Sequence, residues 1–322
     1  MDVAVEGLRF ERGGRTVLDI ARLAFAGGST TAVFGPNGSG KTTLLRLIGG
    51  LERPSAGAVR IGGRLVTRDL ASRRHVGFAF QEAVFVGGSV RRNLDLALRL
   101  RALPPADRSA RIAEAASECG IQPVLDRPAR QLSSGEAQRA NLARALALRA
   151  PVTLLDEPLT GIDRVTRVQL LDDLPRMLAT FAATTILVTH DREEAFRLAD
   201  HLVVLVEGRV RAAGPKAAIY ARPPDRTTAE LLGYSVVTAR GRTIGVPAGA
   251  WMLGEGEPSF ELVVERVVDM GYHLHAVGMA TDVRVDLRLR PGDPIPNAGE
   301  RVTIAARTQV PVGVGGEKRA GA

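Results

Sequence analysis

Short apolar runs alternate with longer segments of helical spacing along residues 1–233. The apolar runs predict strands over residues 3–10, 17–25, 30–34, 58–61, 76–80, 152–156, 184–189 and 202–206. The helical spacing predicts helices over residues 42–48, 89–101, 107–119, 137–149, 165–181 and 192–199. Because strands alternate with helices, we expect an α/β domain with a mostly parallel sheet, interrupted by a helical insert at about residues 89–130.

The pattern changes after the Pro223-Pro224 pair. Glycine- and proline-containing turns then separate short strand-like segments at residues 238–244, 260–268, 273–279, 283–289 and 302–306. This pattern is typical of a small all-β barrel or sandwich. The sequence therefore predicts two domains, an α/β domain at 1–233 and a β domain at 234–322, with a frayed tail from residue 313.

A glycine-rich turn between the predicted strand at 30–34 and the predicted helix at 42–48 carries the clearest chemical signal. It reads G-P-N-G-S-G-K-T and fits the pattern G-x-x-x-x-G-K-[ST], in which backbone amides and a helix start cradle phosphate groups. Lys41 supplies a positive charge for the outer phosphates, and the Thr42 hydroxyl is a hard oxygen ligand for Mg²⁺. The predicted nucleotide-binding residues of this phosphate loop are Gly35, Pro36, Asn37, Gly38, Ser39, Gly40, Lys41, Thr42 and Thr43.

Two adjacent carboxylates, Asp156 and Glu157, end the apolar run at 152–156. The interior of an apolar strand does not tolerate such charges, so we place them at its open end. Asp156 is then a candidate Mg²⁺ ligand, directly or through water, and Glu157 a candidate base for an attacking water. Gln81 and His190 follow two other predicted strands, so we expect all four side chains at the sheet edge that carries the phosphate loop.

A third motif, L-S-S-G-E-A-Q-R at residues 132–139, begins the predicted helix at 137–149. Ser133 and Glu136 have the spacing of a capping box, and a capped helix start is a second candidate anion site. A phosphate loop does not need a second such site within its own chain. The economical interpretation is that this site serves the nucleotide of a neighbouring chain.

The composition adds few constraints to these motifs. Net charge is +8 over 322 residues, and the excess is almost all arginine, spread along the chain without the aromatic residues of a nucleic-acid face. Cys119 is the single cysteine, which excludes an intramolecular disulfide and fits a reducing compartment. The first residues lack the features of a secretory signal, and the longest apolar runs are too short to span a membrane. We therefore expect no nucleic-acid partner and, if a membrane is involved, a separate membrane chain.

Taken together, these residues resemble the ATP-binding subunits of ABC transporters. The shared motifs occur in that family's order and cover residues 1 to about 233: the phosphate loop, Gln81, the stretch at 132–139, L-L-D-E-P at 154–158, G-I-D at 161–163 and Thr189-His190. The resemblance implies a P-loop NTPase that hydrolyses ATP with Mg²⁺ and acts as a head-to-tail homodimer. Each ATP would then lie between the phosphate loop of one chain and Ser133 and Gly135 of the other.

The resemblance also implies roles for single residues and for partners. Gln81 would reach Mg²⁺ or the attacking water and report nucleotide state to the helical insert. His190 would contact the γ-phosphate, and Asp163 would lie at the dimer seam. The subunit would sit at the cytoplasmic face of the inner membrane, bound to permease subunits and served indirectly by an extracytoplasmic solute-binding protein.

The sequence departs from the family pattern in places. Ser134 stands where the signature usually has glycine, and the aromatic residue that usually stacks on adenine is displaced, which leaves Arg12 or Phe10 for that contact. Residues 234–322 resemble the small OB- or TOBE-like β domains of importer ATPases, some of which bind a regulatory ligand. His273 and His275 would share one strand face, but without cysteine or carboxylate companions they make a poor metal site.

Other readings stay open at this point. An ABC-type ATPase that acts on DNA or ribosomes is the alternative, although no heptad run and no second phosphate loop is present. A regulatory module that binds ATP without hydrolysis is a further alternative, which Glu157 disfavours. The transported substrate is not written in the sequence; the single short β domain resembles importers of oxyanions such as molybdate or tungstate.

Overall fold

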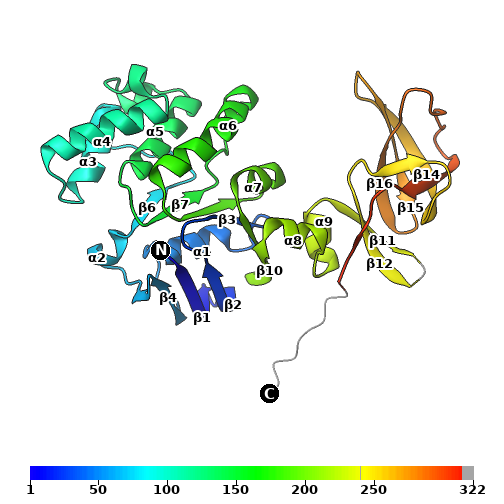
Figure 1. Cartoon of the computed structure of the whole chain (residues 1–322), viewed down its shortest axis with the longest axis horizontal. Coiled ribbons are helices and arrows are strands. Elements are labelled where there is room, and N and C mark those ends of the chain that lie inside the picture. The colour runs from blue at the N-terminus through cyan, green and yellow to red at the C-terminus, as the bar shows by residue number, and fades with distance from the viewer. Residues whose placement is uncertain (240, 314–322) are drawn as a thin grey trace. The chain divides into compact units, whose positions relative to one another are not determined.

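The chain divides after Lys216 into a first unit, Met1–Lys216, and a second unit, Ala217–Ala322. The structure is a computed structural model, and it describes residues 1–239 and 241–313 (Figure 1). The predicted frayed tail therefore lies outside the described residues apart from Gly313.

A six-stranded sheet in the order β10-β9-β3-β8-β7-β6 carries the first unit. Five strands run parallel: β3 (Thr30–Phe34), β6 (Val76–Ala79), β7 (Val152–Asp156), β8 (Thr185–Thr189) and β9 (His201–Val206). The predicted parallel sheet is thus confirmed. The sixth strand, β10 (Arg209–Pro215), pairs antiparallel with β9 at the edge and was not predicted. Its side chains alternate between exposed and half-buried, so it lacks the apolar run that identified the others.

An antiparallel sheet in the order β2-β1-β4-β5 completes the core of the first unit. Its strands are β1 (Val3–Arg12), β2 (Arg15–Phe25), β4 (Ala56–Ile61) and β5 (Arg64–Leu65). The inward side chains of β1 and β2, among them Leu8 and Phe25, join one buried cluster with Leu44 and Leu45 of α1 (Lys41–Ile48). This packing fixes the helix that begins at the phosphate loop.

The expected helical insert follows β6. It contains α3 (Val90–Arg99), capped by Ser89, and α4 (Pro105–Glu118), with α2 (Leu70–Arg73) just before β6. The next helix, α5 (Ser134–Leu146), begins one turn earlier than the predicted residue 137, because Ser133 caps it directly. The first unit continues with α6 (Arg164–Phe181) and α7 (Arg192–Leu198), both close to the predicted ranges.

The second unit is a small antiparallel β domain preceded by short helices. The helices are α8 (Lys216–Ala221) and α9 (Arg226–Leu231), neither of which was predicted. One sheet has the order β13-β17-β14-β15-β16, with β13 (Trp251–Leu253), β14 (Ser259–Asp269), β15 (Leu274–Ala280), β16 (Val283–Arg288) and β17 (Arg301–Ala306). The other has the order β11-β12-β18, with β11 (Tyr234–Ala239), β12 (Arg242–Pro247) and β18 (Val310–Pro311).

One strand prediction in this unit is wrong. The segment 238–244 is not a single strand, because β11 and β12 form an antiparallel hairpin that turns within it. Gly241 adopts a φ of 75°, a left-handed conformation that suits glycine and a tight turn.

Candidate active site

The phosphate loop leaves β3 and enters α1 in a conformation that demands glycine at two positions. A Cβ on Gly35 would lie 2.0 Å from the carbonyl oxygen of Leu205, so the loop passes directly against β9. Gly40 has a φ of 98°, and a Cβ there would lie 2.7 Å from the Leu18 side chain. The loop is therefore clamped between the two sheets at both ends, which presets its shape for an anion.

The Lys41 and Ser39 side chains of the loop are buried. The Lys41 Nζ donates hydrogen bonds to the carbonyl oxygens of Gly35 (3.0 Å) and Pro36 (2.9 Å). Burial lowers the pKa of Lys41, while the nearby Glu157 and Asp156 act in the opposite direction. Within residues 1–239 and 241–313, the buried Ser39 Oγ has no hydrogen-bond partner. These groups fit a phosphate anion, which offers oxygens to both.

Two of the three predicted magnesium ligands, Thr42 and Asp156, lie against each other, while the third, Gln81, donates a hydrogen bond to Glu157. The Thr42 Oγ1 donates a hydrogen bond of 2.9 Å to the Oδ1 of Asp156, the last residue of β7. Asp156 is only 2% exposed, and burial raises the pKa of its carboxyl although the Thr42 bond lowers it. A hydroxyl and a buried carboxylate side by side are hard oxygen ligands, so the pair fits Mg²⁺ once nucleotide oxygens complete the coordination.

Glu157 is held by three side chains at the same sheet edge. Its Oε2 accepts hydrogen bonds from Gln81 Nε2 (3.2 Å) and Thr160 Oγ1 (3.1 Å) and lies 3.2 Å from His190 Nδ1. Its backbone has a φ of 44°, rare for a non-glycine residue, and its amide donates to Val188 O. The structure thus brings together the predicted Gln81, Glu157 and His190 and adds Thr160, which sequence reasoning missed.

The helix start at Ser133 lies on another element. Ser133 and Glu136 form the predicted capping box: the Ser133 amide donates to the Glu136 carboxylate at 2.8 Å, and the Ser133 Oγ accepts from the Glu136 amide at 3.3 Å. A Cβ on Gly135 would lie 2.5 Å from Thr166 of α6, so packing within the chain already requires this glycine. Among the residues that the structure describes, no hydrogen bond joins Ser133 or Gly135 to the phosphate loop.

The remaining candidates have local partners. Phe10 is buried in the core, and the exposed Arg12 lies over its ring at 5.4 Å while pairing with Glu52 at 2.9 Å. Of these two only Arg12 faces solvent. Asp163 caps α6 by accepting bonds from the Val165 and Thr166 amides, both at 3.0 Å. The Thr166 side chain, followed by the Thr166 amide, is the main reason why the pKa of Asp163 lies below its usual range.

One histidine of the pair in the second unit has a carboxylate partner that the sequence interpretation did not predict. His275 Nδ1 lies 2.5 Å from the carboxylate of Asp286, which β16 brings beside β15. The rings of His273 and His275 lie 4.5 Å apart. Across residues 1–239 and 241–313, no group of three or more His, Cys, Asp or Glu side chains could hold a metal ion by itself.

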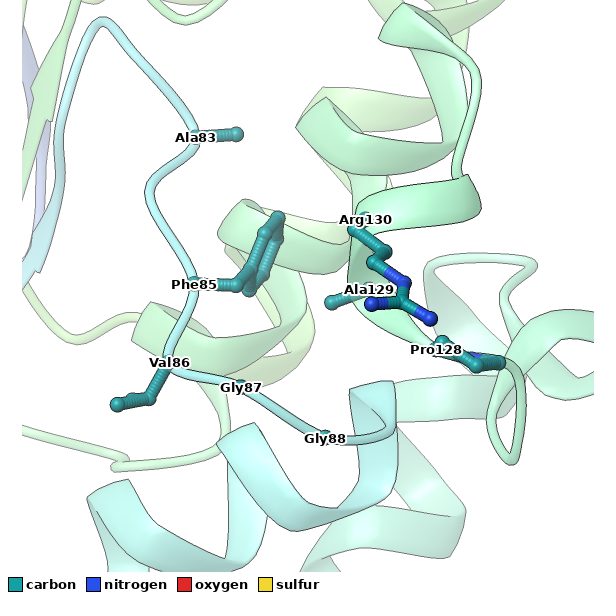
Figure 2. A pocket seen from close by; sticks show the side chains of 8 residues that line it. All are labelled: Ala83, Phe85, Val86, Gly87, Gly88, Pro128, Ala129 and Arg130. Carbon is teal, nitrogen blue, oxygen red and sulfur yellow. The ribbon is translucent and has the colours of Figure 1, made fainter.

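A groove of about 500 Å³ lies between the loop that follows Gln81 and the segment before α5 (Figure 2). Figure 2 shows Phe85 of the loop and Arg130 of the facing segment extending toward the space between them. The groove is lined by Ala83, Phe85, Val86, Gly87, Gly88, Pro128, Ala129 and Arg130. Asn93 of α3 pins the loop by hydrogen bonds to the amide and carbonyl of Val86, at 2.8 and 3.0 Å.

Asp156 gives a prediction about stability. Because the folded state raises the pKa of this buried carboxyl, its charge opposes folding at neutral pH, and the opposition weakens as pH falls through that raised pKa. The change Asp156→Asn keeps an acceptor for Thr42 and removes the charge. Without nucleotide at pH 7.5, we expect the melting temperature of the variant to rise by about 2–4 °C for each kcal/mol of stability gained. The rise should be smaller at pH 5. The variant should also lose Mg²⁺-dependent hydrolysis. Calorimetry at both pH values checks this, and a lower melting temperature at pH 7.5 would contradict it.

The sequence is similar to those of known proteins. A family model described as ABC transporter matches residues 18–160. A Fe(3+) ions import ATP-binding protein of Streptomyces coelicolor is 37% identical, with 80% of this chain and 75% of the relative covered. A sulfate/thiosulfate import ATP-binding protein of Thermosynechococcus vestitus is 39% identical, with 72% and 70% covered. An sn-glycerol-3-phosphate import ATP-binding protein of Paracoccus denitrificans is 33% identical, with 93% of both chains covered.

Solved structures share the fold over most of this chain. A subunit of the cbiONQ ABC transporter complex of Clostridium perfringens has a TM-score of 0.62 at 26% identity, with 71% of this chain and 92% of that chain covered. In the part of the chain that the structure describes, every helix falls short of the length and apolar character that a membrane crossing needs.

Proposed function

Because the chain belongs to the import ATP-binding proteins of the ABC transporter family, which are ATPases that work with membrane permeases, we propose that two copies form a head-to-tail homodimer. In this dimer the phosphate loop of one copy and the capped start of α5 in the other hold one ATP between them. Hydrolysis then drives import through the permease. We place the ATP-binding domain at residues 1–233 and the TOBE-like domain at 234–322.

The observation that carries the proposal is the position of Glu157. Its carboxylate lies at the sheet edge beside Asp156 and Thr42, with Gln81, Thr160 and His190 fixing one oxygen. The other oxygen, Oε1, has no hydrogen-bond partner within the described ranges, so it is free to accept a proton from water. A positioned base next to a phosphate cradle supports ATP hydrolysis over nucleotide binding alone.

The groups around Glu157 would bind the phosphates and Mg²⁺. Lys41 exchanges its two loop carbonyls for phosphate oxygens, because a charged acceptor binds an ammonium group more strongly than a neutral one does. Thr42 and Asp156 would hold Mg²⁺, which supplies charge neutralisation on the phosphates. His190 has a half-exposed side chain, which leaves its ring room to turn toward a γ-phosphate.

The groove of Figure 2 is the proposed docking site for the permease. Its mostly apolar lining suits a helix end from a partner. One side of the groove is the loop that follows Gln81, so the partner would sense what Gln81 binds. The subunit would thereby be held at the cytoplasmic face of the inner membrane, and a solute-binding protein would act only through the permease.

Val86 tests this docking site. Its side chain is 59% exposed while its backbone is pinned by Asn93, so Val86→Lys should leave the loop in place. We expect this charge to weaken permease binding by about tenfold or more, because an unpaired charge is costly to bury, with ATP hydrolysis by the isolated subunit within twofold. The measurement is co-purification and ATP-dependent uptake in vesicles that contain the permease. Leu65→Lys, at an equally exposed apolar residue outside the groove, is the matched control. Equal loss in both variants, or none in Val86→Lys, would contradict the assignment.

The cargo proposal is an oxyanion or a molecule that carries one. The relatives described above include importers named for sulfate and for glycerol phosphate, but also one named for ferric ion, and none of the three is named for molybdate or tungstate. None of them is named for action on DNA or ribosomes, so that alternative is not carried further. Competition among labelled sulfate, glycerol phosphate, molybdate and ferric ion in the same vesicles distinguishes these cargos.

A further inference from the structure

A partly buried ion network surrounds the turn that carries His190 and takes no part in the site described so far. Arg167 of α6 places its Nη2 2.7 Å from the Asp191 Oδ2 and 2.9 Å from the Glu194 Oε1. The second oxygen of Glu194, Oε2, accepts a hydrogen bond of 2.7 Å from the Thr189 Oγ1. Glu194 is 4% exposed, so it is a buried charge rather than part of a solvated surface.

This network holds the chain on both sides of His190. Thr189, the last residue of β8, donates to Glu194 and accepts from the Asp191 amide at 2.9 Å. Asp191 caps α7 by accepting from the Glu194 amide at 3.0 Å and also pairs with Arg167. With both neighbours fixed, the His190 side chain is the part of this turn that projects to the site, where it lies 3.2 Å from Glu157.

The charges of the network depend on one another. Burial raises the pKa of Glu194, and the bonds from Thr189 and Arg167 oppose that rise. Burial would also raise the pKa of Asp191, yet the Glu194 amide and Arg167 bring it below its usual range. Without Arg167, two carboxylates would face each other in a partly buried turn, and the turn would have to rearrange.

We propose that Arg167 and Glu194 are positioning residues for ATP hydrolysis, which act by fixing the turn that presents His190 to Glu157 and the γ-phosphate. The proposal rests on the proposed function, since it assumes that His190 works in ATP turnover. It assigns a catalytic consequence to two residues whose contacts are with Thr189 and Asp191, the neighbours of His190. Small displacements of a catalytic group are sufficient for such an effect, because about 1 Å can cost up to 10²-fold in rate.

The test uses variants that keep the shape of the network. Glu194→Gln removes the buried charge, and Arg167→Lys keeps a charge but loses the two-pronged geometry. We expect both to lower kcat by about 10- to 100-fold with the KM for ATP within twofold, and Arg167→Lys to retain more activity than Arg167→Ala. In a His190→Ala background, single-turnover rates should change less than twofold on adding Glu194→Gln, since the positioned group is then absent.

A matched control separates positioning from general stability. Arg197 also joins α7 to α6, through Asp172, but on the exposed surface away from His190. Arg197→Ala should shift the melting temperature without changing kcat. Unchanged kcat in Glu194→Gln, or an equal fall with and without His190, would overturn the proposal. If His190→Ala itself leaves turnover unchanged, the site assignment under the proposed function fails instead.

Discussion

Replacing Glu157 by glutamine is expected to lower ATP turnover by about 10²–10⁴-fold while ATP still binds, the scale of a lost general base. The amide has the shape of the carboxylate and keeps an oxygen for the bonds from Gln81 and Thr160. It cannot take a proton from water at neutral pH. Phosphate release and equilibrium ATP binding, measured on the same preparation, separate the loss of the base from a loss of the pocket.

Glu193→Gln is the matched control for this variant. Glu193→Gln makes the same change of charge on α7, where the exposed Glu193 side chain pairs with Arg197. Its turnover should stay within twofold of the wild type. Turnover near the wild-type rate in Glu157→Gln, or an equal loss in both variants, would remove Glu157 from the role of base.

Replacing Lys41 by alanine is expected to weaken ATP binding by roughly 10- to 100-fold, because a hydrogen bond to a charged group contributes about 1.5–3 kcal/mol. The Lys41 ammonium already points into the loop, where it bonds the carbonyls of Gly35 and Pro36. Its loss removes the positive charge that faces the phosphates. Titration with a fluorescent ATP analogue in the Glu157→Gln background measures this affinity without turnover.

Lys216→Ala supplies the control for the lysine change. Lys216 likewise donates to a backbone carbonyl, that of Phe196, at 2.6 Å, but it lies far along the chain from the phosphate loop. ATP affinity should be unchanged in this variant. If Lys41→Ala binds ATP as tightly as the wild type does, the cradle assignment is wrong, and a matching loss in Lys216→Ala would indicate a general loss of folded protein.

Local motifs could be predicted from the sequence because the residues that form them are close together in the chain. The strand Val152–Asp156 has the predicted bounds, since Val-Thr-Leu-Leu followed by two carboxylates admits few other structures. The capping box at Ser133 and the glycine-rich loop were predictable for the same reason. The shared sheet edge followed from the rule that parallel strands end on one side.

Features that depend on contacts between residues far apart in the sequence could not be predicted. The strand β10 was missed because its side chains alternate between exposed and half-buried and form no apolar run, and its place in the sheet depends on pairing with β9. The hairpin between β11 and β12 was taken for one strand, although Gly241 was a signal for a turn. Arg167 and Glu194 lie 27 positions apart, so no spacing could show that the fold joins them at the turn that carries His190.

The central claim is that the nucleotide pocket is divided between two copies of this chain. Lys41→Ala damages the cradle of its own chain, and Ser133→Arg, a bulky change at an exposed helix start, damages the pocket of the partner. Each variant alone should be inactive. In an equal mixture, half the dimers are hybrids with one intact pocket, so we predict recovery of roughly a quarter of the wild-type hydrolysis rate. Wild-type rates for Ser133→Arg alone, or no recovery in a mixture whose hybrid dimers are detected by affinity tags, would contradict the divided pocket.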